Sequence, residues 1–290
     1  MRSFSQVDVF SAEPLLGNPV AVVHGADGLS EDRMARFARW TNLSETTFLL
    51  EPTRSGADYR SRIFTPGGEL PFAGHPTLGS AHAWLEAGGV PRAAGTEDVV
   101  VQECAAGLVS LRRGPTTADP ATAERGGRLA FAAPPLFRSG EVSAEDRAQV
   151  ARALRLDESE IVDCNWTDNG PGWVSVLLED AYAVLALRPD HAAFGDLDIG
   201  VVGPYPEGAT DAQVEVRAFV PGMGIGEDPV TGSLNAGIGQ WLVGTRLPAS
   251  YVASQGTALG RRGRVHVDLE GDTLWVGGDT GTTVRGHVDL

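Results

Sequence analysis

One short pattern, R-x-F-x-P-G, occurs twice in the chain, at residues 62–67 and again at residues 217–222. After each copy come a loop, a proline and a run rich in glycine, alanine and serine that ends in Trp-Leu. Pro-Gly is a common turn dipeptide, so the pattern alone could recur by chance. The matching order of strand, motif, proline and small-residue run argues against chance. The repeat therefore predicts two similar domains.

The two small-residue runs, near residues 74–85 and 228–242, have an unusual composition for helices. Glycine lowers helix propensity, and small side chains leave much of the backbone uncovered. Such a helix makes sense where a curled sheet surrounds it tightly, because small side chains permit close approach. We therefore predict an α+β fold with two similar domains, each a curved, barrel-like β-sheet around a central helix. The N-termini of both helices follow polar loops, and two such N-termini facing one cleft would form an anion site.

Hydrophobic periodicity predicts the other elements. A helix that follows the cap Ser30 is expected to bury an apolar stripe of Met34, Phe37, Ala38 and Trp40. A second amphipathic helix is expected over residues 143–154, with Ser143 as its cap. Short strands are expected at residues 7–10, 20–23, 47–50, 99–101, 108–111, 129–132, 174–178, 183–187, 214–219, 265–269 and 273–276.

The domain boundaries follow from the length of the chain and from one breaker-rich segment. At 290 residues the chain has room for about two domains. The segment near residues 114–127 has no apolar periodicity and is dense in turn residues. We expect an N-terminal domain over 1–117, a linker over 118–127 and a C-terminal domain over 128–276. Residues 277–290 are expected to be able to pack back on the first domain.

The absence of lysine excludes several kinds of chemistry. All 23 basic residues are arginine, and 38 acidic residues give a net charge of −15. Pyridoxal-phosphate enzymes, Schiff-base aldolases and P-loop proteins each need a lysine. The acidic surface disfavours nucleic acid and anionic membranes as partners. With no apolar signal segment after Met1 and no run of about 18 apolar residues, we expect a cytoplasmic protein.

No cofactor or metal motif is present, so we expect a protein without cofactors. The glycines at residues 222–226 have the wrong spacing for a dinucleotide loop. His75 and His82 could share a helix face only if His75 were helical, and Pro76 argues against that, so we expect no metal site. Cys104 and Cys164 fit no zinc or redox motif. We expect them to be buried thiols, and a disulfide between them remains an alternative.

Three residues stand out as candidates for chemistry. His75 precedes the first small-residue helix, and Asp228 precedes the second, at comparable places in the repeat. Glu45 lies at the entrance of an expected strand. Each also has a structural interpretation: Asp228 as a helix cap, His75 as an ordinary loop residue, and Glu45 as an exposed turn residue.

Four motifs in this chain occur together and in a fixed order. They are GNPVAVV with Asn18, SETTF at residues 44–48, FTPGGELPFAGHPTLGSAHAW at 64–84 and GEDPVTGS at 226–233. In combination they resemble the PhzF family of phenazine biosynthesis, from residue 7 to about residue 242. The resemblance implies the diaminopimelate-epimerase-like fold, with the site in the cleft between the two domains.

The resemblance also implies an activity. The family's namesake isomerises trans-2,3-dihydro-3-hydroxyanthranilate without a cofactor, as a homodimer, and its glutamate moves a proton from C3 to C1 of the ring. That glutamate matches Glu45, and the family's histidine and aspartate match His75 and Asp228. Residues that hold the substrate, including its carboxylate, are expected at Gly74, Thr77, Thr231, Gly232 and Ser233.

Three other functions stay open at this point. One is isomerisation of a different natural-product diene, since the site motifs do not identify the substrate. Another is amino-acid epimerisation, but the related epimerases use two cysteines as paired bases, and neither site loop here contains one. The third is non-catalytic binding of a small molecule, because a fold does not determine a function.

Overall fold

The computed structural model describes residues 1–92, 99–114 and 127–290. It divides into two units: unit 1 is Met1–Ala132 with Gly277–Leu290, and unit 2 is Ala133–Val276. The predicted linker, 118–127, lies outside the described residues except for Gly127. Residues 128–132, which we expected in the second domain, belong to unit 1 because they form a strand that pairs with the strand before it.

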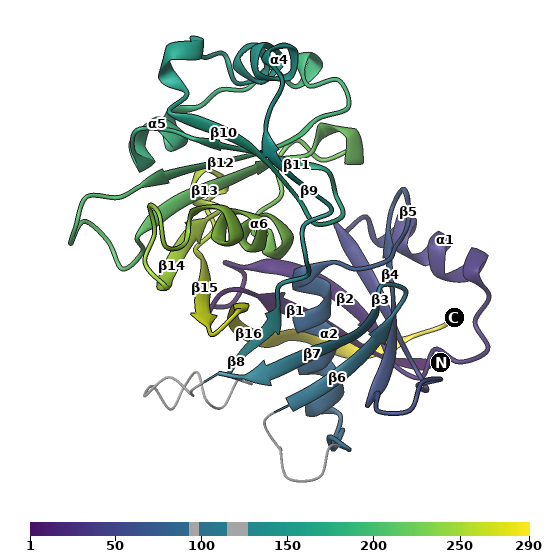
Figure 1. The fold of residues 1–290 in the computed structure, drawn as a ribbon. Coiled ribbons are helices and arrows are strands. Elements are labelled where there is room, and N and C mark those ends of the chain that lie inside the picture. Colours follow the sequence, from purple (N-terminus) through teal and green to yellow (C-terminus); the bar gives the residue numbers. More distant parts are fainter. Residues whose placement is uncertain (93–98, 115–126) are drawn as a thin grey trace. The chain divides into compact units, whose positions relative to one another are not determined.

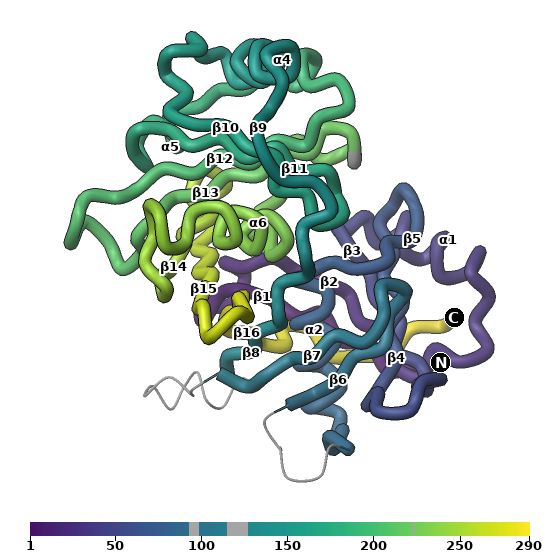
Figure 2. Tube along the Cα trace, viewed as in Figure 1, coloured from purple at the N-terminus to yellow at the C-terminus, as the bar shows by residue number. Residues whose placement is uncertain are grey.

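Unit 1 is a closed sheet around a helix (Figure 1). The strands pair in the order β1-β2-β3-β4-β6-β7-β8-β16, and β16 pairs with β1 to close the ring, while β5 extends from β4. The tube in Figure 2 follows β16, in yellow, from β15 to the C-terminus. The strands are β1 (Arg2–Val9), β2 (Asn18–Val23), β3 (Glu45–Leu50), β4 (Tyr59–Thr65), β5 (Gly68–Leu70), β6 (Val99–Cys104), β7 (Gly107–Arg113), β8 (Arg128–Ala132) and β16 (Thr273–Val288).

The helix inside unit 1 is α2 (Gly74–Glu86), the first of the two small-residue helices. Its residues 74–83 are all buried, and it packs against β1, β2, β3, β4, β6 and β8. Small residues are required for this approach: a Cβ atom added to Gly79 would lie 2.3 Å from Cγ1 of Val20. The composition of the helix is therefore explained by its enclosure in the sheet, as predicted.

Helix α1 (Glu31–Thr41) lies outside this barrel and begins at the predicted cap. The Ser30 side chain accepts a hydrogen bond from the Arg33 amide, and Met34 and Phe37 are buried. Trp40, expected in the same buried stripe, is instead 80% exposed and stacks on Phe37. It lies at the margin of the apolar stripe, on the side of the helix that faces solvent.

Unit 2 repeats the arrangement with an open curved sheet. Its strands pair in the order β16-β15-β14-β13-β12-β11-β10-β9. They are β9 (Arg138–Glu141), β10 (Asp163–Asp168), β11 (Trp173–Leu177), β12 (Asp198–Pro204), β13 (Val214–Phe219), β14 (Ser250–Gln255), β15 (Gly263–Glu270) and the start of β16. The helices are α4 (Ala144–Leu154), α5 (Ala181–Ala186) and α6 (Gly232–Leu242), with short 3-10 turns η1 (Glu158–Glu160), η2 (His191–Ala193), η3 (Pro221–Met223) and η4 (Thr257–Leu259).

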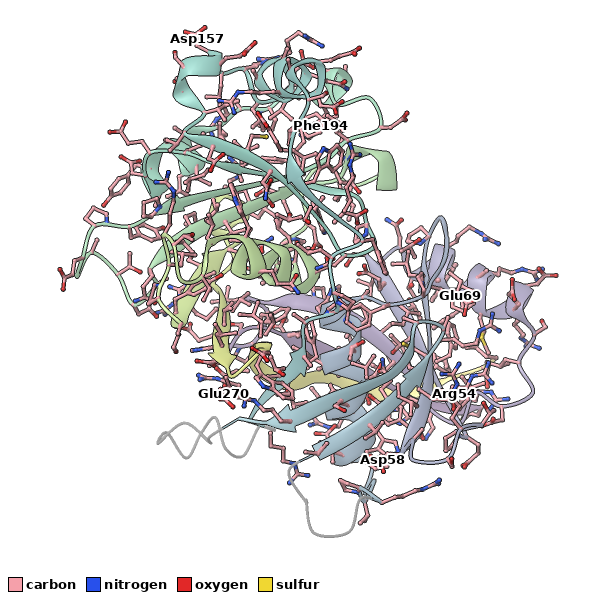
Figure 3. All side chains as sticks on the ribbon, in the orientation of Figure 1. Arg54, Asp58, Glu69, Asp157, Phe194 and Glu270 are labelled. Carbon is pink, nitrogen blue, oxygen red and sulfur yellow. The ribbon has the colours of Figure 1, made fainter. Side chains whose placement is uncertain are left out.

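The two faces of this sheet carry different helices, as the alternation along β11 shows. Val174 and Val176 join a hydrophobic cluster with residues of α4 and α5 and with Phe194, which is labelled in Figure 3. Trp173 and Ser175 point to the opposite face, because successive side chains of a strand alternate. On that face lies α6, the second small-residue helix, which packs against β10, β11 and β15.

One predicted strand is wrong. Residues 183–187 lie largely in helix α5, since Ala181–Ala186 is helical. Alanine and leucine are good helix formers, and the Asp180 side chain caps the helix by accepting from the Ala183 amide. The apolar run was too short for its period to distinguish a strand from a buried helix. Among the described residues, the structure contains no helix with the length and hydropathy needed to span a membrane.

The packing of α2 predicts that Gly79→Ala destabilises the protein. The new methyl group meets two buried valines, Val9 and Val20, neither of which can swing away. Overpacking destabilises by about 1–3 kcal/mol, and we expect this cost to exceed the gain of about 1 kcal/mol from the higher helix propensity of alanine. We expect a lower denaturation midpoint in urea, whereas the control Gly286→Ala, with open space at its Cβ, should stay close to wild type. Equal stability of the two variants would contradict the close packing.

Candidate active site

In unit 1 the structure brings Glu45 and His75 together. Glu45 is the first residue of β3, and His75 is the second residue of α2. The carboxylate oxygen Oε2 of Glu45 lies 3.3 Å from Nε2 of His75, and the two side chains are only 14% and 4% exposed. The contact is close but not aligned as a hydrogen bond, which is common for catalytic pairs without substrate. Glu45 is therefore not the exposed turn residue of the alternative interpretation.

Asn18, which was not among the predicted site residues, contacts the histidine ring. Its amide Nδ2 lies 3.3 Å from Nδ1 of His75, and its Oδ1 accepts a hydrogen bond from Ser44. The Asn18 contact is on the Nδ1 side of the ring, so Nε2 is the nitrogen that faces Glu45. Asn18 lies in the GNPVAVV motif, which was the available signal. We call Asn18, Ser44, Glu45 and His75 the unit 1 cluster.

Burial keeps the imidazole of His75 neutral. Desolvation lowers the pKa of His75 from 6.5 to about 3. A hydrogen bond with the Pro19 backbone raises the pKa, but by less. The neutral ring is a weak proton acceptor. Of the two groups in contact, the carboxylate is thus the better candidate for a general base.

His75 is helical, contrary to our expectation from Pro76. Proline is tolerated here because the amides of a first helical turn have no intrahelical acceptor. His75 and His82 nevertheless have different partners, since the ring nitrogens of His82 lie 3.0 and 2.9 Å from the hydroxyls of Thr280 and Thr282. In the part of the chain that the structure describes, no group of three or more His, Cys, Asp or Glu side chains is arranged to hold a metal ion.

Gly74 and Thr77, the two other predicted site residues of unit 1, differ in the groups that they make available to a ligand. Gly74 begins α2, and the backbone there has no side-chain cap because the N-cap residue is Ala73. Thr77, which we expected at the helix start, lies three residues further on and is fully buried. Its hydroxyl accepts a hydrogen bond from Gln102, and its amide donates to Ala73. These contacts assign the side chain of Thr77 to the packing of α2.

In unit 2 the candidate residues form a second hydrogen-bonded group. Thr231 donates from its hydroxyl to the carboxylate of Asp228 at 2.5 Å. Gln255 on β14 donates to the Thr231 hydroxyl at 2.9 Å and to the backbone oxygen of Asp228 at 3.2 Å. Its Oε1 accepts from the Thr231 amide and from Asn235. We call Asp228, Thr231, Asn235 and Gln255 the unit 2 cluster; nothing in the sequence pattern indicated Gln255 or Asn235.

The structure also decides the alternative interpretation of Asp228. The N-cap residue of α6 is Thr231, and Asp228 lies three residues before it. Asp228 is therefore not the N-cap residue of α6, and its carboxylate accepts a hydrogen bond from the Thr231 hydroxyl. Gly232 and Ser233 form the first turn of α6. The hydroxyl of Ser233 accepts a hydrogen bond from the indole of Trp173, which the sequence analysis did not assign to the site.

The two buried helices differ from the surface helices at their N-termini. Side chains of Ser30, Ser143 and Asp180 cap α1, α4 and α5. In contrast, the N-cap residues of α2 and α6, Ala73 and Thr231, make no side-chain cap hydrogen bond. The first amides and the positive end of the dipole of such a helix favour an anion. This arrangement suits the carboxylate of a small ligand.

Both cysteines lie outside these clusters. Cys104 and Cys164 are free and buried, so they do not form the disulfide considered from the sequence. Burial raises the pKa of Cys104, and it raises the pKa of Cys164 to about 11. Neither thiol is ionised at neutral pH, and the thiolate is the reactive form.

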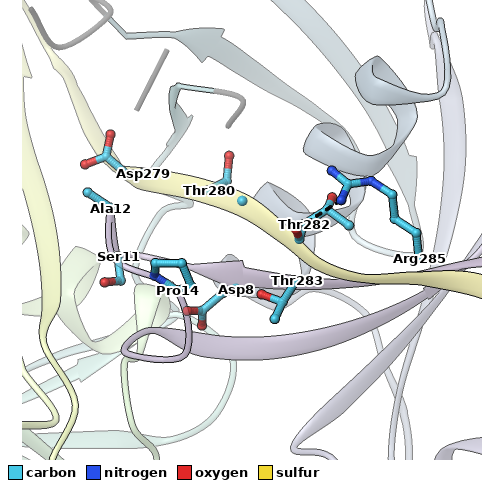
Figure 4. A pocket seen from close by; sticks show the side chains of 10 residues that line it. Asp8, Ser11, Ala12, Pro14, Asp279, Thr280, Thr282, Thr283 and Arg285 are labelled. Atoms are coloured by element: carbon cyan, nitrogen blue, oxygen red, sulfur yellow. Dashed lines mark hydrogen bonds between the residues drawn. The ribbon is translucent and has the colours of Figure 1, made fainter. Parts of the chain in front are cut away.

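A cavity of about 320 Å³ in unit 1 is lined by residues of β1, of the loop that follows β1 and of β16 (Figure 4). Asp8, Asp279 and Arg285 line it together with serine and threonine hydroxyls. None of the predicted site residues lines it.

Comparison with known proteins gives a consistent result over nearly the whole chain. A family model described as phenazine biosynthesis-like protein matches residues 7–288. Antisense-enhancing sequence 1 of Schizosaccharomyces pombe is 37% identical over 302 residues, covering 98% of both chains. Trans-2,3-dihydro-3-hydroxyanthranilate isomerase of Pseudomonas aeruginosa is 35% identical over 286 residues, 93% of this chain and 91% of the relative. A PhzF-family phenazine biosynthesis protein of Bacillus anthracis matches with a TM-score of 0.78 at 22% identity, covering 100% and 99%.

The fold and these matches define an isomerase with two related α+β domains. The chain belongs to the phenazine biosynthesis-like family, as its four motifs predicted. The predicted fold class is confirmed, since the solved relative shares the architecture over its full length.

The neutral state of His75 predicts a pH dependence of stability. Its folded pKa of about 3 lies below the unfolded value of 6.5, so between these values the unfolded chain binds more protons. Stability is fully present above pH 6.5 and falls as the pH drops toward 3, by up to about 1.4 kcal/mol per pH unit. In denaturant titrations from pH 7 to 4, the free energy of unfolding of His75→Asn should fall less steeply with decreasing pH than that of the wild type. The exposed control His287→Asn should show the wild-type dependence on pH. A wild-type dependence in His75→Asn would show that the ring is not buried in its neutral form.

Proposed function

We propose that this protein is a cofactor-free isomerase that moves a proton and a double bond in a small carboxylate-bearing diene of the trans-2,3-dihydro-3-hydroxyanthranilate type, in secondary metabolism such as phenazine biosynthesis. The observation that carries the proposal is the Glu45 carboxylate 3.3 Å from a buried, neutral His75. The name and the identity of the Pseudomonas aeruginosa relative support the substrate type.

Glu45 is the proposed base. It takes the proton from C3 of the ring and returns it to C1, and the resulting enol becomes a ketone. Atoms and electrons balance within the substrate, so the reaction needs no oxidant, reductant or second substrate. His75 does not compete for the proton, because its pKa is about 3. It is proposed to hydrogen-bond a polar group of the substrate and to stabilise charge as the double bonds shift.

The remaining polar groups are proposed to bind and orient the substrate. The first turn of α2, with Gly74, and the first turn of α6, with Ser233, are each a candidate to bind its carboxylate. Asp228, oriented by Thr231, accepts a hydrogen bond from a polar group of the substrate. These local dipoles favour an anion even though the whole chain carries a net charge of −15.

The central test is Glu45→Gln. Glutamine keeps the shape and the hydrogen-bonding capacity of glutamate but cannot accept a proton from carbon. We expect turnover of trans-2,3-dihydro-3-hydroxyanthranilate, followed by loss of diene absorbance, to fall by about 10²–10⁴-fold or more. Binding measured by calorimetry should change little. Glu51→Gln, just beyond the other end of β3, is the matched control and should keep full activity.

Two outcomes would contradict the proposal in different ways. Turnover near the wild-type rate in Glu45→Gln would remove Glu45 from the mechanism. A wild-type protein that leaves this diene unchanged would show that the substrate type is wrong.

The competing epimerase function depends on two cysteine thiols, and a separate experiment tests whether the cysteines are needed for turnover. Because Cys104 and Cys164 are buried and protonated, the double variant Cys104→Ser/Cys164→Ser should retain turnover within a few-fold. Circular dichroism checks that the variant is folded. A folded double variant without any activity would restore the two-thiol mechanism.

A further inference from the structure

The arginine of each R-x-F-x-P-G copy makes the same set of contacts. In unit 2, Arg217 donates two hydrogen bonds to the carboxylate of Glu227, from Nε at 2.9 Å and from Nη2 at 2.7 Å. Its guanidinium carbon lies 4.8 Å from the centre of the Phe219 ring, which is the F of the motif. The pair is almost fully buried, with side chains 7% and 9% exposed.

In unit 1, Arg62 makes the corresponding contacts. It donates from Nε at 2.7 Å and from Nη2 at 2.6 Å to Glu69, and its guanidinium carbon lies 5.1 Å from the ring of Phe64. Glu69, labelled on β5 in Figure 3, precedes α2, as Glu227 precedes α6. This pair is more exposed, with side chains at 17% and 29%, and Glu31 is a further partner of the arginine. Both copies of the repeat thus contain an arginine bound to a glutamate in the segment that precedes a small-residue helix.

The loop that Arg217 holds is the loop of Asp228. Glu227 is the residue immediately before Asp228. The amide of Asp228 donates to the backbone oxygen of Ala218, and its own oxygen accepts from Gln255. The backbone of Asp228 is therefore fixed between β13 and β14, while the preceding side chain is fixed to β13 through Arg217.

Arg217 is itself held from a second direction. Its Nη1 donates to the backbone oxygens of Val184 and Leu187, at 3.3 and 3.0 Å, at the C-terminal end of α5. A cation suits this negative end of a helix. The guanidinium thus joins α5, β13 and the Asp228 loop, and only its planar fork can make all these bonds at once.

We propose that the Arg217–Glu227 ion pair is a positioning device for the Asp228 carboxylate, and that Arg62–Glu69 is its counterpart for the start of α2. This inference rests on the proposed function, because it assigns Asp228 a role in the reaction. Removing one partner leaves a buried charge without its counterion, and the loop then shifts. A displacement of about 1 Å in a catalytic group can cost about 100-fold in rate.

The test uses Arg217→Lys, which keeps the charge but loses the two-pronged bond, and Glu227→Gln, which keeps the shape. We expect kcat to fall by about 10- to 100-fold in both. The control is Arg264→Lys, because Arg264 makes the same two-pronged contact with Asp211 elsewhere in unit 2. That control should stay within a few-fold of wild type.

A double-variant cycle separates positioning from general destabilisation. If Arg217 acts through Asp228, Arg217→Lys should cost little more once Asp228→Asn is present. Independent, multiplicative losses would overturn the proposal, as would near-wild-type kcat in both single variants.

Amide hydrogen exchange gives a readout that does not depend on the substrate. In both single variants, exchange in the segment 226–231 should accelerate, while Arg264→Lys leaves it unchanged. If the wild type fails to convert the diene, the proposed substrate fails, and accelerated exchange still supports the positioning role. Unchanged exchange in Arg217→Lys and Glu227→Gln would overturn it.

Discussion

The enclosure of a helix by a curved sheet is the constraint on which the rest of this structure depends. α2 is surrounded on many sides by the strands of unit 1, and α6 lies against the strands of unit 2. Such an approach is possible only with glycine, alanine and serine at the contacts, as Gly79 and Gly237 show. The enclosed helices then begin at fixed places on each sheet, and the candidate residues are distributed around those two starting points.

The chemistry of the candidate residues follows from the same burial. A histidine at the start of α2 loses its charge, so the neighbouring carboxylate is the proposed base. Buried cysteines remain protonated. Helix starts without side-chain caps leave amides for an anion. A strongly acidic chain thus has two local positions, the starts of α2 and α6, that favour an anion.

Much of this could be predicted from the sequence, because the signals were local or repeated. The R-x-F-x-P-G copies and the small-residue runs predicted two domains with enclosed helices, and Ser30 and Ser143 were identified as caps. Residues 183–187 were misassigned because a short apolar run fits both a strand and a helix. Gln255 contacts Asp228, which is distant in sequence, and no local pattern indicates such a contact. Asn18 also contacts a distant residue, His75, and its place in the GNPVAVV motif was the only signal for it. The roles of Glu45, His75 and Asp228 remain predictions.

The path of β16 has a consequence for how the chain folds during synthesis. Unit 2 is inserted between two parts of unit 1, and the strand that closes the unit 1 barrel against β1 comes from the C-terminal segment. On the ribosome, unit 2 has all of its strands before unit 1 has its closing strand. Until then the backbone edge of β1 is unpaired, which is the feature that promotes aggregation of sheets. The nascent chain thus carries an open barrel through most of its synthesis, and a truncation within β16 would leave it open permanently.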